Sequence, residues 1–236
     1  MTHEHSAVDP PVNGLWQIRK LLRSSLRALS RPFASGRCAR PLDALPLALV
    51  IPLDGDVADE VTRLQVGILR KYGRNPGLEA PPHITLKLGF NVTDSAPFEE
   101  YLAQLGGEIY PFEIVINGFD FFDEGILFLD VEPSPELEKL RQRILCELAE
   151  RWGIQAQPIE DSRFRFHVTL AYGLSNREFA ELRKSFASRA LQFKFSARHI
   201  DMFCHTGQHW VTLKRTNLRG CANPSTSTTA HEIHAG

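Results

Sequence analysis

Two short strings in this 236-residue chain place a threonine two positions after a histidine. Both have the order histidine, β-branched residue, threonine, leucine: His83-Ile84-Thr85-Leu86 and His167-Val168-Thr169-Leu170. In a β-strand, residues i and i+2 project from the same face, so each string would present an imidazole and a hydroxyl side by side. Histidine titrates near neutral pH. Two imidazoles therefore suit acid–base chemistry at a phosphodiester, with His83 and His167 as the candidate catalytic residues.

Other side chains could complete such a site. Thr85 and Thr169 could donate hydrogen bonds to the nonbridging oxygens of a phosphate. Arg165, like Arg163 before it, could hold a phosphate, although a solvated charge at a strand edge is an equally good interpretation. Three aromatic residues could stack on a base, against the commoner alternative of core packing: Tyr172, Phe203 and Trp210.

The spacing of cysteines and histidines does not indicate a metal centre. The four cysteines form no CxxC pair, so we expect reduced thiols. His199, His205 and His209 lie near one turn, but no carboxylate or cysteine completes a ligand set with them. We interpret them as exposed turn histidines, and we expect neither a metal nor another cofactor.

Composition permits one large domain or two small lobes, since 43% of the residues are hydrophobic. The net charge is −1, but the first 44 residues hold seven Arg or Lys against three acidic residues. The remainder is therefore acidic, which argues against a broad surface for polyanions. No apolar run is long enough for a transmembrane helix or a signal peptide, so we expect a cytoplasmic protein.

Residues 14–31 are expected to form an amphipathic helix. At about 100° per residue, apolar and basic side chains fall on adjoining arcs: Leu15, Ile18, Leu22, Leu26 and Leu29, then Arg19, Lys20, Arg23, Arg27 and Arg31. Three interpretations stay open: the helix could lie on an anionic membrane surface, bind RNA without sequence preference, or pack on the domain. A mitochondrial presequence is a weaker alternative, because Glu4 and Asp9 precede the helix.

Apolar spacing predicts strands and helices in alternation from residue 45 onward. The expected strands are 47–52, 83–90, 112–122, 126–131, 164–172, 193–203 and 209–218. The expected helices are 54–72 with Asp54 or Asp56 as cap, 95–105, 135–152 with Ser134 as cap, and a short one after Ser175. Each half has the order strand, long helix, loop, His-x-Thr strand, shorter helix and strand. We infer a structural duplication with mostly antiparallel sheets.

The chain resembles the 2H phosphoesterase superfamily, and within it the 2′-5′ RNA ligase and RNA 2′,3′-cyclic phosphodiesterase-like proteins. The residues that carry the resemblance are Pro82-His83-Ile84-Thr85-Leu86 and Phe166-His167-Val168-Thr169-Leu170. It implies an α+β fold, bilobal and duplicated, in which two mostly antiparallel sheets face a central cleft and helices lie outside. It also implies one string on each wall and no metal. The resemblance makes His83 the proton donor and His167 the acceptor, although the sequence alone leaves that order open.

The sequence thus predicts a metal-independent phosphodiesterase that hydrolyses 2′,3′-cyclic phosphates at RNA ends or in nucleotides, with ligation-like activity in the reverse direction. Two alternatives stay open: a phosphodiesterase for 2′-5′-linked oligonucleotides, and a non-catalytic RNA- or nucleotide-binding module tethered by its basic helix. The expected organisation is a basic helix and linker at 1–44, a two-lobed 2H domain at 45–218 and a disordered tail at 219–236. We expect a cytoplasmic monomer, which residues 14–31 could bring to an anionic membrane surface.

Overall fold

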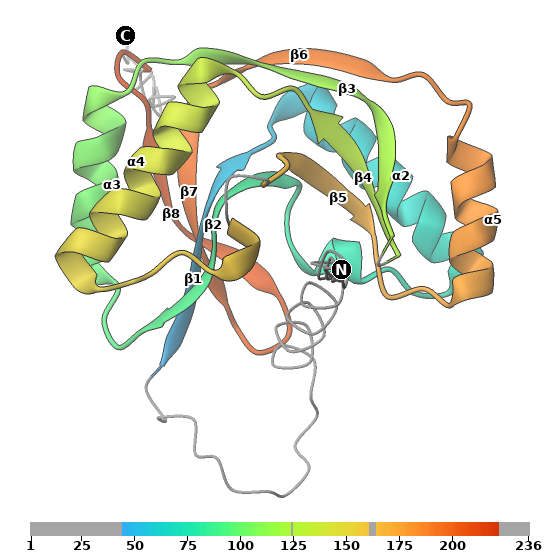
Figure 1. Ribbon diagram of the computed structural model, residues 1–236, viewed down its shortest axis with the longest axis horizontal. Helices are drawn as coiled ribbons and strands as arrows, with labels where there is room; N and C mark the ends of the chain where they lie inside the picture. The colour runs from blue at the N-terminus through green and yellow to red at the C-terminus, as the bar shows by residue number, and fades with distance from the viewer. Residues whose placement is uncertain (1–43, 124, 161–163, 222–236) are drawn as a thin grey trace, which may run out of the picture. The chain divides into compact units, whose positions relative to one another are not determined.

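The computed structural model describes residues 44–221 except 124 and 161–163 (Figure 1). The expected helix at 14–31 lies outside the described residues, as do Arg163 and the tail from residue 222.

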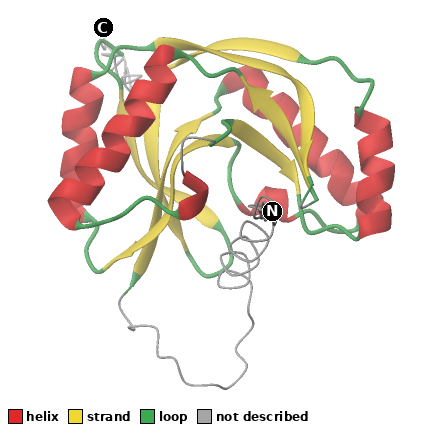
Figure 2. Ribbon diagram, viewed as in Figure 1, coloured by secondary structure: helices red, strands yellow, loops and turns green. Residues whose placement is uncertain are grey.

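Two four-stranded sheets form the body of the described part (Figure 2). Sheet 1 has the strand order β2-β1-β7-β8, and sheet 2 has the order β5-β4-β3-β6. The strands are β1 (Leu45–Pro52), β2 (His83–Val92), β3 (Phe112–Phe122), β4 (Ile126–Val131), β5 (His167–Ala171), β6 (Gln192–Ala197), β7 (His199–His205) and β8 (Trp210–Asn217). The helices are α2 (Gly55–Tyr72), α3 (Ala96–Glu108), α4 (Pro135–Trp152) and α5 (Asn176–Phe186), with short 3₁₀ turns η1 (Pro76–Glu79) and η2 (Pro158–Glu160). Among the described residues all paired strands run antiparallel, which confirms the expected α+β architecture.

Local signals start two of the helices as the sequence predicts. Ser134 caps α4 by accepting a hydrogen bond from the backbone N–H of Leu137, and Pro135 occupies the first helical position. At the start of α5, Ser175 and Glu178 form a capping box in which each side chain accepts from the other's backbone N–H.

The start of α2 differs from the expectation. Asp54 occupies the N-cap position, but its side chain makes no capping hydrogen bond. Its carboxylate instead accepts from Arg215 Nη1 at 3.1 Å and lies 3.2 Å from His199 Nδ1. A long-range ion pair has therefore displaced the local cap.

The prediction of one strand at 193–203 is wrong. This segment forms two strands, β6 and β7, which belong to different sheets and are separated at Arg198. The apolar alternation changes phase there, because Phe195 and Ala197 occupy odd positions while Ile200 and Met202 occupy even ones. The expected strand at 164–172 is also shorter, since β5 begins only at His167.

The structure contains the expected duplication, with an exchange that the sequence did not indicate. The order strand, long helix, 3₁₀ turn, His-x-Thr strand and shorter helix occurs in a first repeat (residues 45–108) and a second repeat (126–186). The long helices are exchanged: α2 packs against β5 of sheet 2, and α4 packs against β2 of sheet 1 (Figure 1). The two repeats therefore interlock.

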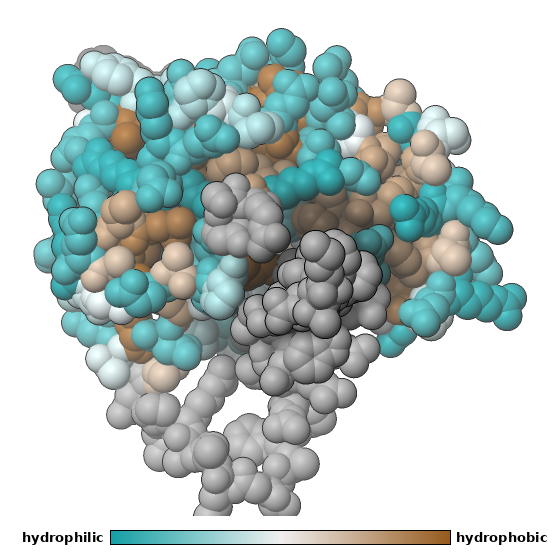
Figure 3. All heavy atoms as spheres, in the orientation of Figure 1, coloured by the Kyte–Doolittle hydropathy of each residue, from teal (hydrophilic) through white to brown (hydrophobic). Residues whose placement is uncertain are grey.

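Each sheet has one face in the main hydrophobic core and a second face that carries the strings. The main core includes apolar residues from both sheets and from the helices. On the other face of sheet 1, Ala48, Val50 and Phe203 form a separate small cluster, with Ala80 and Trp210 packed against it. Figure 3 shows hydrophobic side chains near the middle of the molecular surface in this view and hydrophilic ones along its upper rim.

Close packing of α3 on β8 depends on one glycine. A Cβ atom at Gly106 would clash with the side chain of Thr216 and would lie 2.6 Å from the carbonyl oxygen of Asn217. The neighbouring Gly107 has no atom within 4 Å of that position. A side chain at position 106 would therefore push α3 away from β8, whereas a side chain at position 107 would meet no other atom.

We expect Gly106→Ala to lower the free energy of unfolding by about 1–3 kcal/mol, because α3 must move away from β8. The matched control Gly107→Ala should raise it by roughly 0.5–1 kcal/mol, since alanine favours the helix and nothing obstructs it. Urea titrations of the two variants measure both changes. Equal stability of the two variants would contradict the close approach of α3 and β8.

Candidate active site

The two His-x-Thr strings lie on neighbouring edge strands. β2 is an outer strand of sheet 1 and β5 is an outer strand of sheet 2, and the two strands contact each other. His83 is the first residue of β2 and His167 the first of β5. Each threonine, Thr85 or Thr169, follows in regular strand register and so projects from the same face as its histidine. The fold therefore brings together two strings that are far apart in the chain.

Both imidazoles are anchored in the same way. Nδ1 of His83 lies 2.7 Å from the carbonyl oxygen of Pro81, and Nδ1 of His167 lies 2.8 Å from that of Arg165. A carbonyl oxygen only accepts, so each Nδ1 carries the hydrogen in this arrangement. In the neutral ring Nε2 is then the unprotonated nitrogen, available to take or return a proton. Both strings therefore present the same ring nitrogen for proton transfer.

Aromatic rings pack against both imidazoles, which are partly buried. The ring of Phe203 meets His83 edge-on at 5.1 Å between centroids. Phe122 and Phe128 contact His167, with centroid distances of 5.1 and 5.3 Å. Charged imidazolium is poorly solvated in such surroundings, so both histidines favour the neutral form.

The pKa values of both histidines are lowered. Burial is the main cause of the fall in the pKa of His83 to about 4, and the charge of His167 adds to it, against the opposing hydrogen bond to Pro81. Burial also lowers the pKa of His167, with a smaller contribution from the positive charge of Arg165. Both imidazoles are therefore mostly neutral in the free protein near pH 7.

A cavity of about 110 Å³ lies at this junction. Its lining includes His83 from the first string and Thr169 from the second, together with Tyr172 and Trp210. Phe203 does not line the cavity. It is buried and packs edge-on against His83, so its ring is not available to stack on a base. The other lining residues come from α2 and from η1 and its flanking loop: Gln65, Pro76, Gly77, Glu79, Ala80, Pro81 and Pro82.

Arg165 lies beside the second string and is held by two carboxylates. Its Nη2 is 2.7 Å from Asp120, and its Nε donates to Asp130 at 2.9 Å. Its guanidinium also lies 5.0 Å from the centre of the Phe128 ring. The charge that the sequence suggested for a phosphate is therefore already paired.

Side chains from the first repeat hold the string of the second. Gln65 on α2 donates from Nε2 to the carbonyl oxygens of Thr169 and Gly77, both at 3.0 Å. Asn75 donates to the carbonyl of Leu170 at 2.9 Å. Gly77 lies so close to β5 that a Cβ there would be 2.7 Å from the Leu170 oxygen. The outer edge of β5 is thus occupied by α2 and η1.

The second repeat holds the first string in a corresponding way. Glu160 on η2 accepts from the backbone N–H of Leu88 at 2.7 Å and from Lys87 Nζ at 2.6 Å. Lys87 and Glu160 are both almost fully buried. Arg141 on α4 donates to the Glu160 carbonyl at 2.8 Å. Removing either partner of such a buried pair leaves an uncompensated charge, which typically costs about 3–5 kcal/mol.

Sequence reasoning did not identify these anchoring residues. A signal existed for two of them: Lys87 is a lone charge in an apolar strand, and Gln65 falls among the buried positions of α2. A buried polar residue needs a partner, so each should have raised the question of what it binds. No local pattern marked Asn75 or Glu160 as that partner.

The histidines near the last turn take no part in the site. His205 is buried against Trp210, so the expectation that it is exposed is wrong, and its Nδ1 accepts from the Gly207 N–H at 3.2 Å. His199 lies beside Asp54, and His209 is exposed. Within the described residues, no group of three or more His, Cys, Asp or Glu is arranged to hold a metal ion.

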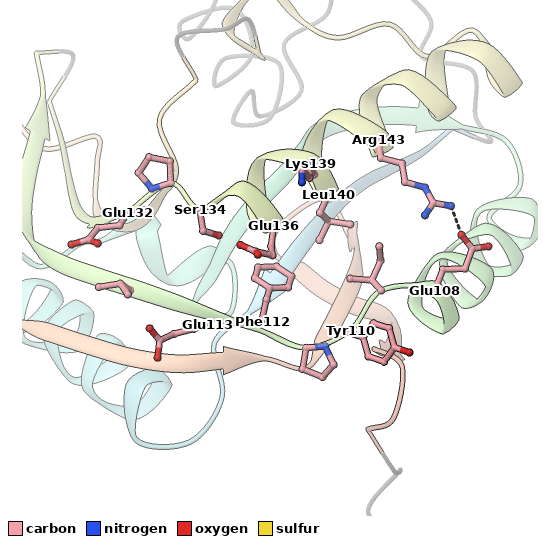
Figure 4. Close-up of a pocket in the computed structure, with 14 residues that line it drawn as sticks. Glu108, Tyr110, Phe112, Glu113, Glu132, Ser134, Glu136, Lys139, Leu140 and Arg143 are labelled. Atoms are coloured by element: carbon pink, nitrogen blue, oxygen red, sulfur yellow. Dashed lines mark hydrogen bonds and ion pairs between the residues drawn. The ribbon is translucent and has the colours of Figure 1, made fainter.

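A larger cavity, of about 790 Å³, lies between the start of β3 and the start of α4 (Figure 4). Four of its lining residues are glutamates, against one lysine and one arginine, and at its rim Glu108 pairs with Arg143 at 2.6 Å. None of the candidate site residues lines it. Its acidic lining and its separation from the strings leave the smaller cavity as the candidate site.

Known proteins match this arrangement. The 2′-5′ RNA ligase superfamily matches residues 53–209. The chain belongs to this superfamily. The match confirms the resemblance carried by the two strings, and membership supports an enzyme of the phosphodiesterase or ligase type.

Individual relatives of this superfamily member are distant. A protein of Bacillus pumilus (strain SAFR-032) described as “Putative phosphoesterase” is 28% identical over 120 residues, which cover 48% of this chain and 64% of that protein. The match thus spans less than two thirds of that relative. The crystal structure of TT0787 from Thermus thermophilus has a TM-score of 0.53 and 20% identity, covering 74% of this chain and 98% of that one. LigT of E. coli in its apo form has a TM-score of 0.46 and 19% identity, covering 75% and 98%. The Thermus structure confirms the fold.

No helix among the described residues is both long enough and apolar enough to cross a membrane.

We expect stability to fall as the pH is lowered from about 6.5 towards 4. Because the pKa of His83 is about 4 in the folded protein, and near 6.5 in an unfolded chain, the unfolded state binds more protons between these values. The variant His83→Asn should flatten this decline, and His209→Asn, changed in an exposed turn, serves as the matched control. Urea titrations from neutral pH down to about 4 measure the effect. The same pH dependence in His83→Asn and the wild type would contradict the assignment.

Proposed function

We propose that this chain hydrolyses 2′,3′-cyclic phosphates, at RNA ends or in nucleotides, by metal-independent acid–base catalysis. The observation that carries the proposal is the matched pair of imidazoles. His83 and His167 lie at the starts of contacting edge strands, each with Nδ1 bound to a carbonyl and Nε2 available for proton transfer. Superfamily membership supports the same kind of chemistry.

Each imidazole has one proton to move. The oxygen of a water molecule forms a bond to phosphorus, and the bond from phosphorus to one ribose oxygen breaks. His167 takes a proton from the water, and His83 gives a proton to the departing ribose oxygen, in the roles that the resemblance implies. The products are a phosphomonoester and a free ribose hydroxyl. Proton exchange with solvent then restores both rings, and the reverse sequence is the ligation-like direction.

The lowered pKa values fit this cycle. In the free protein both rings favour the neutral form, which suits the acceptor and leaves the donor without its proton. A bound phosphodiester brings a negative charge next to both rings, and an opposite charge raises the pKa of a histidine. Substrate binding therefore helps to load the donor with the proton that it must deliver.

The threonine hydroxyls supply hydrogen bonds to the phosphate. Negative charge gathers on the nonbridging oxygens in the transition state, and donors already aimed at them lower the barrier. Thr169 lines the cavity beside His83, and Thr85 shares a strand face with that histidine. Trp210 and Tyr172 line the same cavity and offer apolar ring surface for a base.

The size of the cavity favours a short substrate. About 110 Å³ is small beside the roughly 300–1,000 Å³ of typical ligand pockets, so it suits one terminal nucleotide, with its phosphate at the strings and its base against Tyr172 or Trp210, rather than an oligonucleotide. A phosphodiesterase for 2′-5′-linked oligonucleotides would need a second base platform along a longer cleft. A non-catalytic binding module would bind the same ligands without turnover.

We expect His83→Ala and His167→Ala each to lower kcat at least about 100-fold, since positioned acid–base groups usually supply roughly 10²–10⁴-fold. His209→Ala, in the exposed turn, should keep the wild-type rate. The assay compares cyclic mononucleotides, RNA ending in a cyclic phosphate and 2′-5′ oligoadenylate, with EDTA and no added metal. Retention of more than about a tenth of the turnover in either alanine variant would overturn the mechanism, and faster turnover of oligoadenylate would favour the second phosphodiesterase.

Thr169→Val should lower kcat on the order of 10²-fold with little change in KM, because the lost hydrogen bond strengthens in the transition state. Thr169→Ser keeps the hydroxyl and should restore most of the rate. Steady-state kinetics on a cyclic mononucleotide separates the two parameters. If valine and serine variants behave alike, the hydroxyl has no catalytic role.

A further inference from the structure

Arg165, Asp120 and Asp130 form a cluster next to the second string, which we call the Arg165 cluster. Nε of Arg165 is 2.9 Å from Asp130 and its Nη2 is 2.7 Å from Asp120. Hydrogen bonds to Asp130 and then to Asp120 raise the pKa of the guanidinium. Burial acts to raise the pKa of Asp120, but the Phe121 N–H, Arg165 and, to a smaller extent, the nearby charge of Arg183 outweigh it and hold that pKa below its usual value. The cluster therefore combines one positive charge with two carboxylates.

Strand register puts this cluster on the face that carries the string. Asp130 on β4 pairs directly with His167 on β5. On the next row, Thr169 pairs with Phe128, which in turn pairs with Asp120 on β3. Directly paired residues of antiparallel strands project from the same face. Both carboxylates thus share the sheet face of His167 and Thr169.

Sheet 1 repeats the same arrangement. Arg215 binds both carboxylate oxygens of Asp201, with Nη2 at 2.9 Å, and also reaches Asp54 with Nη1 at 3.1 Å. Asp201 pairs with Val50, which pairs with Thr85 of the first string. Each string therefore shares its sheet face with one arginine held between two carboxylates.

We propose that the Arg165 cluster selects the charge of the ligand: it admits a phosphodiester with one negative charge and disfavours a phosphomonoester with two. This inference rests on the proposed function. It defines the substrate of that function as a single cyclic phosphate, and it predicts that the phosphomonoester product is bound weakly and released. In the described residues, the cavity lining itself contains one carboxylate, Glu79, and no lysine or arginine.

The physical basis is the number of charges on each species. A phosphodiester carries one negative charge, whereas a phosphomonoester carries about 1.5–2 near pH 7. Repulsion by a net negative cluster grows in proportion to the ligand's charge. Hydrolysis first leaves a monoester with one negative charge and one acidic P–OH proton; loss of that proton near pH 7 roughly doubles the charge, and the product is then held less tightly than the substrate.

Asp120→Asn and Asp130→Asn test the proposal, because each removes one charge and keeps the side-chain shape. Binding of adenosine 2′-monophosphate and adenosine 2′,3′-cyclic phosphate is measured by calorimetry at about pH 7.5, where the monoester is mostly dianionic, with the full chain in a His83→Ala background. Asp59→Asn, an exposed aspartate on α2, is the matched control.

Each cluster variant should bind the monophosphate roughly three- to tenfold more tightly, and the cyclic phosphate by a clearly smaller factor. Asp59→Asn should leave the ratio of the two affinities unchanged. An equal change for both ligands, or no change for the monophosphate, would overturn the charge-selection proposal. Conversion of the cyclic phosphate by the His83→Ala protein would count against the proposed function, and the affinity for the monophosphate would still decide the role of the cluster.

Discussion

The outer edges of β2 and β5, which no further strand covers in their own sheets, are the constraint on which the rest of the structure depends. An edge strand presents unpaired backbone N–H and C=O groups, which must find partners or remain in water. The protein places its two strings on such strands and closes each edge with side chains from the other repeat. Because Gln65 binds the backbone of Thr169 and Glu160 binds that of Leu88, the strings keep a fixed position relative to each other.

This closure also sets the electrostatics of the site. Edge strands that meet across a junction put two imidazoles close together, and aromatic rings on both sheets keep their surroundings apolar. Charges are present on the same faces, but they occur as arginines held between carboxylates: Arg165 on sheet 2 and Arg215 on sheet 1. The result is a site whose imidazoles and threonine hydroxyls are neutral in the free protein, which suits a ligand of low charge.

Local features of this chain could be predicted from its sequence. The caps at Ser134 and Ser175 follow from residue spacing, because hydrogen bonds between near neighbours determine them, and most strands follow from the alternation of apolar residues. The break between β6 and β7 could not be predicted in this way, because the apolar residues change from odd to even positions at Arg198 with no turn residue to mark the change. The anchoring of β5 by Gln65 links residues 104 positions apart, and only the order of strands in the sheets determines such a pair.

The exchange of α2 and α4 has a consequence for how such a chain could arise. One repeat alone leaves the edge of its own string without a partner, so it is complete only beside a second copy. A half-length ancestor would have met this need as a symmetric homodimer, with two identical strings around one shared centre. The two repeats now differ, as the residue directly after each string shows: Lys87 follows the first and Ala171 the second.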